Sequence, residues 1–501
     1  MRSLVNSTFA DTRRLRYDCG RSTAKVNASH MIDLSQLPWL LALDLIVVAA
    51  LCGHILLTKD NEAAAFAWIG VVVLAPLLGA LSYILFGINR VERRARKLRH
   101  RPPRFLPVAA TPHSSAESDS VERRIIAATG AVQTLPLTTG NTVRCLVDGD
   151  EAYPTMLSAI HRAQRSIALS TYIFDHDKAG EMFADALAKA RDRGVAVRIL
   201  IDDMGLRYSP SAIDTLLMKR GLTTARFLPT QFRLIRFMNL RNHRKVLVVD
   251  GQEAFIGGMN IRHGHVLAEQ PKYPVRDLHF QVVGPVIDQM SDLFTEDWGF
   301  ATGEDIELPA WVPTPQSVGV AVARLVPDGP DHDFERLQWV IGCALGAARN
   351  RIRIMTPYFL PNPFLAGAMM VAALRGIDVE VIVPSRSNLP FIGWAMASHF
   401  QRLLEHRVKI FLSPQPFDHS KVLLVDDSWC LVGSTNWDQR SLRLNFEANI
   451  EVVDAGLAER LNAIFNTRKA ESQAVDLSAV QRAPITIRLR NNFMRLFSPY
   501  L

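Results

Sequence analysis

The hydrophobic pattern of the chain begins with two long apolar runs. Residues 37–57 and 63–87 are almost entirely hydrophobic, and the link between them is short and polar. As a helix, each run is long enough to cross the roughly 30 Å apolar core of a bilayer. The pattern therefore predicts an N-terminal transmembrane helical hairpin, with transmembrane helix 1 at 37–57 and transmembrane helix 2 at 63–87. This prediction is favoured over a buried hairpin in a soluble protein.

Downstream of the apolar runs, helical and strand periodicities alternate, and the same order occurs twice. The first copy predicts a helix around 156–160, a strand at 166–174, a helix at 180–193 and a strand at 195–201. The second predicts a helix at 335–348, a strand at 351–359, a helix at 364–375 and a strand at 377–383. Gly194 and Gly376 follow the second helix of each copy, where a C-terminal capping glycine is expected. The alternation indicates an α/β fold built from two homologous lobes.

These patterns divide the chain into segments. A polar N-terminal extension is predicted at 1–36, and it would be shorter if Met31 were the true start. The two transmembrane helices follow, and then a basic juxtamembrane segment and linker at 89–139. The rest of the chain is divided into lobe 1 at 140–301, a proline-rich linker at 302–330, lobe 2 at 331–475 and a basic amphipathic C-terminal tail at 476–501. The tail mixes arginines with apolar residues, so it suits either a membrane surface or the surface of the lobes.

Charge and cysteine content narrow the class of protein. The net charge of +8 suits either nucleic acid or an anionic membrane, and the apolar runs favour the membrane. Residues 89–104 hold eight Lys or Arg and one Glu, so the positive-inside rule predicts cytoplasmic lobes. The five cysteines have no paired spacing, which argues against a disulfide framework and a zinc site. We expect neither a metal nor a cofactor.

One eight-residue pattern, H-x-K-x4-D, occurs once in each predicted lobe. The first copy contains His243, Lys245 and Asp250, and the second contains His419, Lys421 and Asp426. A small-residue turn and an asparagine follow at the same offset, in 257–260 and in 433–436. A chance origin is plausible for one copy but not for two copies with matched surroundings. Each copy reads as the entry to a buried strand, which presents His and Lys on one side.

The repeated residue types suit phosphate chemistry. A lysine ammonium binds phosphate oxygens as a point charge, and the amides of Asn260 and Asn436 supply further donors. With an ordinary pKa of about 6.5, one histidine is able to attack phosphorus while another moves a proton. The six signature residues are therefore the candidate catalytic set. Asp250 and Asp426 lie several residues further along each strand, and we interpret them as structural rather than as direct participants.

These residues resemble the phospholipase D superfamily, whose signature is a pair of H-x-K-x4-D motifs, and more narrowly its bacterial cardiolipin synthases. The stretches that carry the resemblance are 239–245, 255–261 and 419–450. The resemblance implies two phospholipase D-like lobes paired as a pseudo-dimer around one cleft. It implies a phosphohistidine intermediate, with His243 as the nucleophile and His419 as general acid and base. A carboxylate lies behind each histidine in that family, at positions matched here by Asp277 and Glu447.

The implied activity is that of a phosphatidyltransferase. It would transfer a phosphatidyl group between two phosphatidylglycerol molecules at a bacterial inner membrane, with no nucleic-acid partner. Alternatives are a lipid hydrolase of the phospholipase D type, a transphosphatidylase with a different acceptor alcohol and a membrane-anchored nuclease. The two apolar runs count against the nuclease. Neither the oligomeric state nor the histidine that holds the intermediate follows from the sequence.

Overall fold

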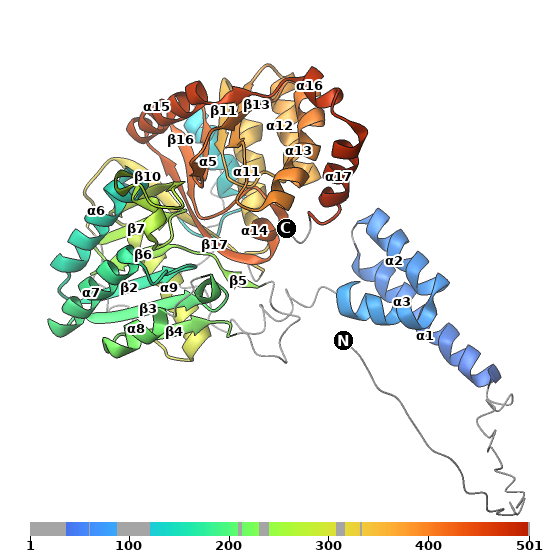
Figure 1. The fold of residues 1–501 in the computed structure, drawn as a ribbon, viewed down its shortest axis with the longest axis horizontal. Coiled ribbons are helices and arrows are strands. Elements are labelled where there is room, and N and C mark those ends of the chain that lie inside the picture. The colour runs from blue at the N-terminus through green and yellow to red at the C-terminus, as the bar shows by residue number, and fades with distance from the viewer. Residues whose placement is uncertain are drawn as a thin grey trace, which may run out of the picture. The chain divides into compact units, whose positions relative to one another are not determined.

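The computed structural model describes most of the chain, and the chain divides into two units (Figure 1). The described residues are 37–59, 61–87, 121–208, 213–229, 240–306, 316–330 and 333–498. The first unit ends at Asn89 and the second begins at Arg90. The predicted N-terminal extension and most of the predicted juxtamembrane segment therefore lie outside the described residues.

The N-terminal unit is a small helical cluster. It contains α1 (Leu37–Thr58), α2 (Glu62–Leu74), α3 (Pro76–Ser82) and a π-helical turn (Tyr83–Gly87). The sequence predicts one helix over 63–87, and the structure breaks it at Ala75, whose backbone leaves the helical region at φ −139°. The break follows from Pro76, which has no amide hydrogen and begins the next helix.

The helices of this unit pack around a few side chains. Ile55, Ala65, Val72 and Tyr83 are buried together, and the hydroxyl of Tyr83 lies 2.9 Å from Nδ1 of His54. Within the described residues, none of the helices combines the length and hydropathy that a membrane crossing requires.

The second unit is built on one sheet whose two halves repeat the same strand order. The strands of lobe 1 are β1 (Thr138–Val147), β2 (Ser166–Thr171), β3 (Ala196–Asp202), β4 (Thr223–Phe227), β6 (Val246–Val249), β7 (Glu253–Gly257) and β9 (Leu278–Val283). Those of lobe 2 are β10 (Ala321–Asp328), β11 (Arg351–Met355), β12 (Asp378–Pro384), β13 (Lys409–Ser413), β15 (Val422–Val425), β16 (Trp429–Gly433) and β17 (Asn445–Val453), with β18 (Gln473–Ala474) at the outer edge.

The spatial order of the strands shows the internal symmetry. Lobe 1 runs β4-β3-β2-β6-β7-β9-β1 and lobe 2 runs β13-β12-β11-β15-β16-β17-β10, so the two halves meet at β1 and β10. These two strands pair antiparallel, with Thr138 opposite Ala323. The predicted α/β fold with two homologous lobes is therefore confirmed for the described residues.

Helices cover the sheet in matching positions. Lobe 1 carries α6 (Asp148–Arg162), α7 (Lys178–Asp192), α8 (Ile213–Lys219) and α9 (Ile287–Thr302), with short 3-10 turns at Gly205–Arg207, His263–His265 and Leu267–Glu269. Lobe 2 carries α11 (Arg336–Ala347), α12 (Pro363–Leu374), α13 (Pro390–Glu405), α14 (Gln439–Arg443) and α15 (Ala455–Glu471), followed by α16 (Leu477–Gln481) and α17 (Ile485–Arg495). The helix α5 (Val121–Gly130) precedes β1. Gly194 and Gly376 have φ of +91° and +93°, so both predicted capping glycines adopt the left-handed conformation.

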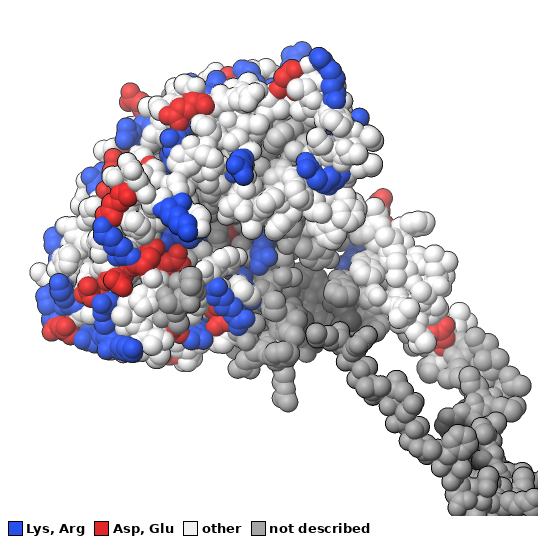
Figure 2. All heavy atoms as spheres, in the orientation of Figure 1, with Lys and Arg blue, Asp and Glu red and all other residues white. Residues whose placement is uncertain are grey.

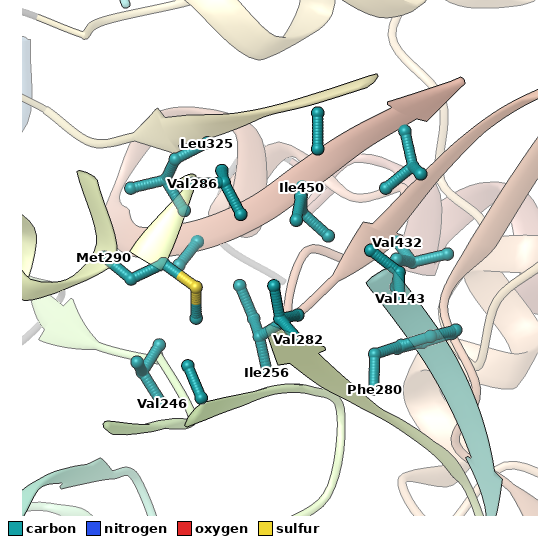
Figure 3. Close-up of a cluster of buried hydrophobic side chains, with 14 of the residues drawn as sticks. Val143, Val246, Ile256, Phe280, Val282, Val286, Met290, Leu325, Val432 and Ile450 are labelled. Carbon is teal, nitrogen blue, oxygen red and sulfur yellow. The ribbon is translucent and has the colours of Figure 1, made fainter. Parts of the chain in front are cut away.

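Both lobes share a central hydrophobic core (Figure 3). Val246, Ile256 and Phe280 enter it from lobe 1, while Val432 and Ile450 enter it from lobe 2. All five side chains are buried. Because apolar surface from both halves is removed from water in one cluster, separating the lobes would expose it again. The two lobes therefore form one folded body.

One expected connection is instead part of the sheet. The prolines in 302–330 predict a linker, yet residues 321–328 form β10, which lies at the seam between the lobes. Pro327 is accommodated near the end of the strand, and Ala321, Ala323 and Leu325 of the same strand are buried. Residues 307–315 of the predicted linker lie outside the described residues.

Two short strand pairs cross from lobe to lobe. The strand β5 (Arg241–Asn242) pairs with β17 of lobe 2, with Arg241 opposite Asn445. In return, β14 (Phe417–Asp418) of lobe 2 pairs with β8 (Val275–Arg276) of lobe 1. Each crossing strand comes directly before a signature histidine, so the exchange fixes the position of both histidines.

Candidate active site

Each signature histidine lies in a tight connection between a crossing strand and a buried strand. The residue before each histidine accepts a hydrogen bond through its side chain from the backbone N–H two residues further on. Arg244 donates to Oδ1 of Asn242 at 3.0 Å, and Ser420 donates to Oδ1 of Asp418 at 3.0 Å. His243 and Lys245 therefore lie just before β6 rather than within it, and the second motif repeats this arrangement before β15.

Backbone hydrogen bonds between the lobes hold these connections. The N–H of His243 donates to the carbonyl of Phe446 over 2.9 Å. The N–H of His419 donates to the carbonyl of Arg276 over 2.8 Å. Each histidine is thus anchored to the lobe that does not contain it.

The side chain of each signature histidine also contacts the opposite lobe. Nδ1 of His243 lies 2.9 Å from Oε1 of Glu447, and Nδ1 of His419 lies 2.8 Å from Oδ2 of Asp277. A carboxylate acceptor at Nδ1 favours the tautomer with the proton on that nitrogen. Nε2 of each ring is then the nitrogen available to a substrate. The carboxylates matched by family resemblance are therefore beside the histidines, and each serves the histidine of the opposite lobe.

The two carboxylates are supported differently. Glu447 accepts hydrogen bonds from the Ser434 hydroxyl at 2.5 Å and from Nδ2 of Asn445 at 3.2 Å. Asp277 accepts the backbone N–H of Leu278 at 2.8 Å. Gly258 occupies the position that corresponds to Ser434, and a Cβ atom there would lie only 2.6 Å from Oδ1 of Asp277. The different small-residue turns of the two motifs therefore match the carboxylates that they contact.

Both signature lysines are buried beside the histidines. Nζ of Lys245 donates to the carbonyl oxygen of His243 over 2.8 Å, and Nζ of Lys421 makes the same contact with His419. Burial lowers the pKa of Lys245 to about 7 and that of Lys421 to about 8, and the charge of Lys421 contributes to the shift at Lys245. Because each histidine contacts a carboxylate of the opposite lobe, the two half-sites lie together at the boundary between the lobes.

Burial also shifts the remaining charged groups of the site. It lowers the pKa of both imidazoles well below the usual range, and the two lysine charges add to that effect. It raises the pKa of Asp277 to about 6 and that of Glu447 to about 7. Burial and the lysine charges therefore disfavour a positive charge on the imidazoles. A phosphate anion between the lysines would relieve that repulsion and favour a protonated histidine.

Asn260 and Asn436 are both buried near the motifs, but their contacts differ. Oδ1 of Asn260 accepts the backbone N–H of Ile173 at 3.1 Å. Nδ2 of Asn436 donates to the hydroxyl of Ser441 at 3.3 Å. Oδ1 of Asn436 is buried without a hydrogen-bond partner among the described residues. Their predicted role as phosphate donors stays a prediction.

The signature aspartates lie at the far end of each buried strand, where their carboxylates accept hydrogen bonds from backbone amides. Asp250 accepts the N–H groups of residues 164, 165 and 166 at 2.8–2.9 Å. Asp426 accepts those of residues 349, 350 and 351 at 2.8–3.0 Å. Both residues have positive φ, at +52° and +54°. These contacts stabilise the turn that enters the neighbouring strand, which is a structural function.

Sequence reasoning missed two aromatic side chains of the site. The ring of Tyr172 lies 5.0 Å from that of His243, and the ring of Tyr358 lies 6.5 Å from that of His419, each in an edge-to-face arrangement. Lys245 also lies over the Tyr172 ring at 5.4 Å. The available signal was a tyrosine in each of the repeated segments 171–174 and 356–359. The two tyrosines occupy adjacent rather than equivalent positions of the repeat, so the two half-sites are not identical.

Together, these groups are suited to covalent phosphoryl chemistry. One Nε2 is able to act as a nucleophile and the other as a proton carrier, while two ammonium groups hold the oxygens of a phosphodiester.

Comparison with known proteins gives consistent matches. The family model described as "Cardiolipin synthase, PLD-like domain" matches residues 156–298 and 341–469, and the model described as "Phospholipase_D-nuclease N-terminal" matches residues 45–87. Cardiolipin synthase 2 of Bacillus anthracis is 30% identical over 472 residues, which cover 91% of this chain and 90% of the relative. Cardiolipin synthase of Clostridium perfringens is 30% identical over 454 residues, which cover 88% and 95%.

A solved structure shares the fold. The phosphatidylserine synthase of Haemophilus influenzae superposes with a TM-score of 0.61 at 15% identity, covering 76% of this chain and all of that one. At this level of identity, the likeness concerns the fold alone.

Proposed function

Because this chain belongs to the cardiolipin synthase family with phospholipase D-like domains, we propose that it joins two phosphatidylglycerol molecules into cardiolipin and releases glycerol. The observation that carries the proposal is the reciprocal pairing of His243 with Glu447 and of His419 with Asp277. That pairing orients two imidazoles beside two buried lysines. A two-step transfer requires these groups as nucleophile, proton carrier and phosphate ligands.

In the first step, Nε2 of His243 attacks the phosphorus of one lipid. The bond between phosphorus and the oxygen of the terminal glycerol breaks, and His419 gives that oxygen a proton. Lys245, Lys421, Asn260 and Asn436 hold the phosphate oxygens, on which charge accumulates in the transition state. Glycerol leaves, and the phosphatidyl group stays on His243.

In the second step, a hydroxyl of the second phosphatidylglycerol gives its proton to His419. Its oxygen attacks phosphorus, the phosphorus–nitrogen bond breaks, and His243 is restored. The acceptor determines the product, since water in place of the second lipid would give phosphatidate. Transfer therefore requires that the phosphoenzyme meet a lipid hydroxyl before it meets water.

We also assign a membrane location to the N-terminal helices. Phe66, Leu57, Leu74 and Leu77 are each more than 80% exposed in the helical unit, which is unusual for side chains of this kind. An apolar bilayer interior would cover them. The basic segment 89–104 would lie at the cytoplasmic headgroups, with the two lobes on the same side of the inner membrane.

The decisive experiment is an assay of the purified full-length chain in mixed micelles of detergent and phosphatidylglycerol labelled in its terminal glycerol. We expect one glycerol released for each cardiolipin formed. Phosphatidate without cardiolipin would identify a hydrolase, and cleavage of plasmid DNA without lipid turnover would identify a nuclease. Either result would contradict the proposal.

Two variants test the roles of the histidines. His243→Ala should abolish both turnover and labelling of the enzyme by lipid phosphate. His419→Asn should slow turnover strongly yet leave a phosphorylated enzyme, with the label on His243, detectable by mass spectrometry. Glu459→Gln, a change of an exposed carboxylate on α15, is the matched control and should behave as the wild type.

A further inference from the structure

The last helix, α17, packs on lobe 2 through a face that holds both polar and apolar residues, including Met494, which contacts the core of the lobe. It lies against α13, where the guanidinium of Arg490 stacks on the ring of Trp394 at 4.6 Å. Asn491 and Met494 are the half-buried residues of the helix. No residue of α17 is fully buried. A surface helix of a globular protein usually turns its apolar side toward the core, whereas most of the large apolar side chains of α17 stay exposed.

The apolar side of α17 faces outward. Ile485, Leu489, Phe493 and Leu496 follow the spacing of one helical face, and they are 64%, 62%, 55% and 69% exposed. The ring of Phe497 extends this face and packs edge-to-face on that of Phe493 at 5.4 Å. A row of large apolar side chains on a helix surface marks a site of interaction.

The charges around this face indicate its partner. Between Leu477 and Ser498 there are four arginines and no acidic residue. Arg488 and Arg495 lie on one flank of the apolar row and Arg490 lies on the other, so the row is bordered by positive charge. In the view of Figure 2, the surface over α17 is white and blue. An apolar row bordered by arginines suits a helix that lies in the headgroup layer of an anionic bilayer.

A second copy of the chain fits this surface less well. In a twofold contact between two α17 helices, each arginine would meet the same set of arginines on the partner, with no carboxylate in the helix to compensate. We therefore propose that α17 is a membrane-surface helix. It inserts Ile485, Leu489, Phe493 and Leu496 among the lipids of an anionic membrane and attaches lobe 2 independently of the N-terminal helices. The proposal does not rest on the reaction assigned to the histidines.

The test uses the full-length chain reconstituted into vesicles, with a photoreactive benzoylphenylalanine in place of Phe493. After illumination, mass spectrometry of the peptides should find lipid adducts at position 493 in vesicles that contain phosphatidylglycerol. The yield should fall at least fivefold in vesicles of phosphatidylcholine alone. Arg488→Gln with Arg495→Gln should remove most of this dependence on lipid charge.

The matched control places the same probe at Met182, an exposed position of α7 at the opposite end of the unit in Figure 1. It should give lipid adducts at no more than a tenth of the yield at position 493. Equal yields at the two positions, or a chain-to-chain cross-link at 493 in place of lipid adducts, would overturn the proposal. Because the readout is a cross-link, it stands apart from any failure of the activity assay.

Discussion

Nδ1 of His243 lies 2.9 Å from the carboxylate of Glu447, although the two residues belong to different lobes. The reciprocal pair, His419 and Asp277, is separated by 2.8 Å. Each lobe therefore supplies one histidine and the carboxylate that orients the histidine of the other lobe. A substitution of either carboxylate should therefore alter the orientation and protonation of the histidine in the opposite lobe.

The first prediction concerns Glu447→Gln and Asp277→Asn. An amide NH2 in place of the carboxylate would face Nδ1 with a donor, which favours the wrong tautomer of the ring. We expect kcat to fall about 10²- to 10⁴-fold with little change in KM. Steady-state kinetics and the 15N chemical shifts of the two imidazoles would check this. Wild-type kcat in both variants would contradict the assigned role.

The second prediction concerns Gly258→Ala. The new Cβ atom would lie 2.6 Å from Oδ1 of Asp277 and would displace that carboxylate from His419. We expect at least a tenfold loss of kcat. The control is Gly367→Ala in α12, where a Cβ atom meets nothing within 4 Å. Removing a glycine from a helix interior should stabilise that variant by about 0.5–1 kcal/mol without affecting kcat.

The third prediction separates the signature aspartates from the chemistry. Asp250→Asn and Asp426→Asn each replace a carboxylate that accepts hydrogen bonds from three backbone N–H groups, and the amide in its place would weaken those bonds. The free energy of unfolding should fall by about 1–3 kcal/mol. The kcat of the folded fraction should stay within about threefold of wild type. Lys245→Ala should give the opposite result, with lost activity and retained stability. Thermal unfolding and kinetics on the same samples would distinguish the two classes.

The fourth prediction concerns pH. Burial lowers the pKa of Lys245 to about 7 and that of Lys421 to about 8. As pH rises through these values the lysines lose the charge that binds phosphate, so kcat/KM should begin to fall at about pH 7 and fall more steeply above about pH 8. Lys245→Arg keeps its charge, so the fall in kcat/KM should begin nearer the pKa of Lys421, at about pH 8, even if the maximum of the profile is lower. A flat profile from pH 7 to 9.5 would contradict the assignment.

The sequence predicted the parts of the site that repeat. Matched spacing in 243–250 and 419–426 identified both halves, and the positions of Gly194 and Gly376 located two helix ends. The crossing of the carboxylates was not predicted, because it depends on the pairing of β5 with β17 and of β8 with β14. Such two-residue strands have too few residues to show a periodicity.

Other features were missed because tertiary contacts overrode the local signals. Pro327 predicts a connection, but the buried residues around it place β10 in the sheet. The break at Pro76 was visible in the sequence and was outweighed by the length of the apolar run. Tyr172 and Tyr358 were recognised only as part of the repeat, since their nearness to the histidines depends on the packing of β2 and β11 beside the motif strands.

The exchange of β5 and β14 also has a consequence for the newly made protein. While the ribosome is still adding the second lobe, His243 has neither its carboxylate nor the strand that anchors it. A polypeptide that ends before lobe 2 therefore contains His243 without the carboxylate that orients it. Both half-sites are therefore complete only after the second lobe has been synthesised and has folded onto the first.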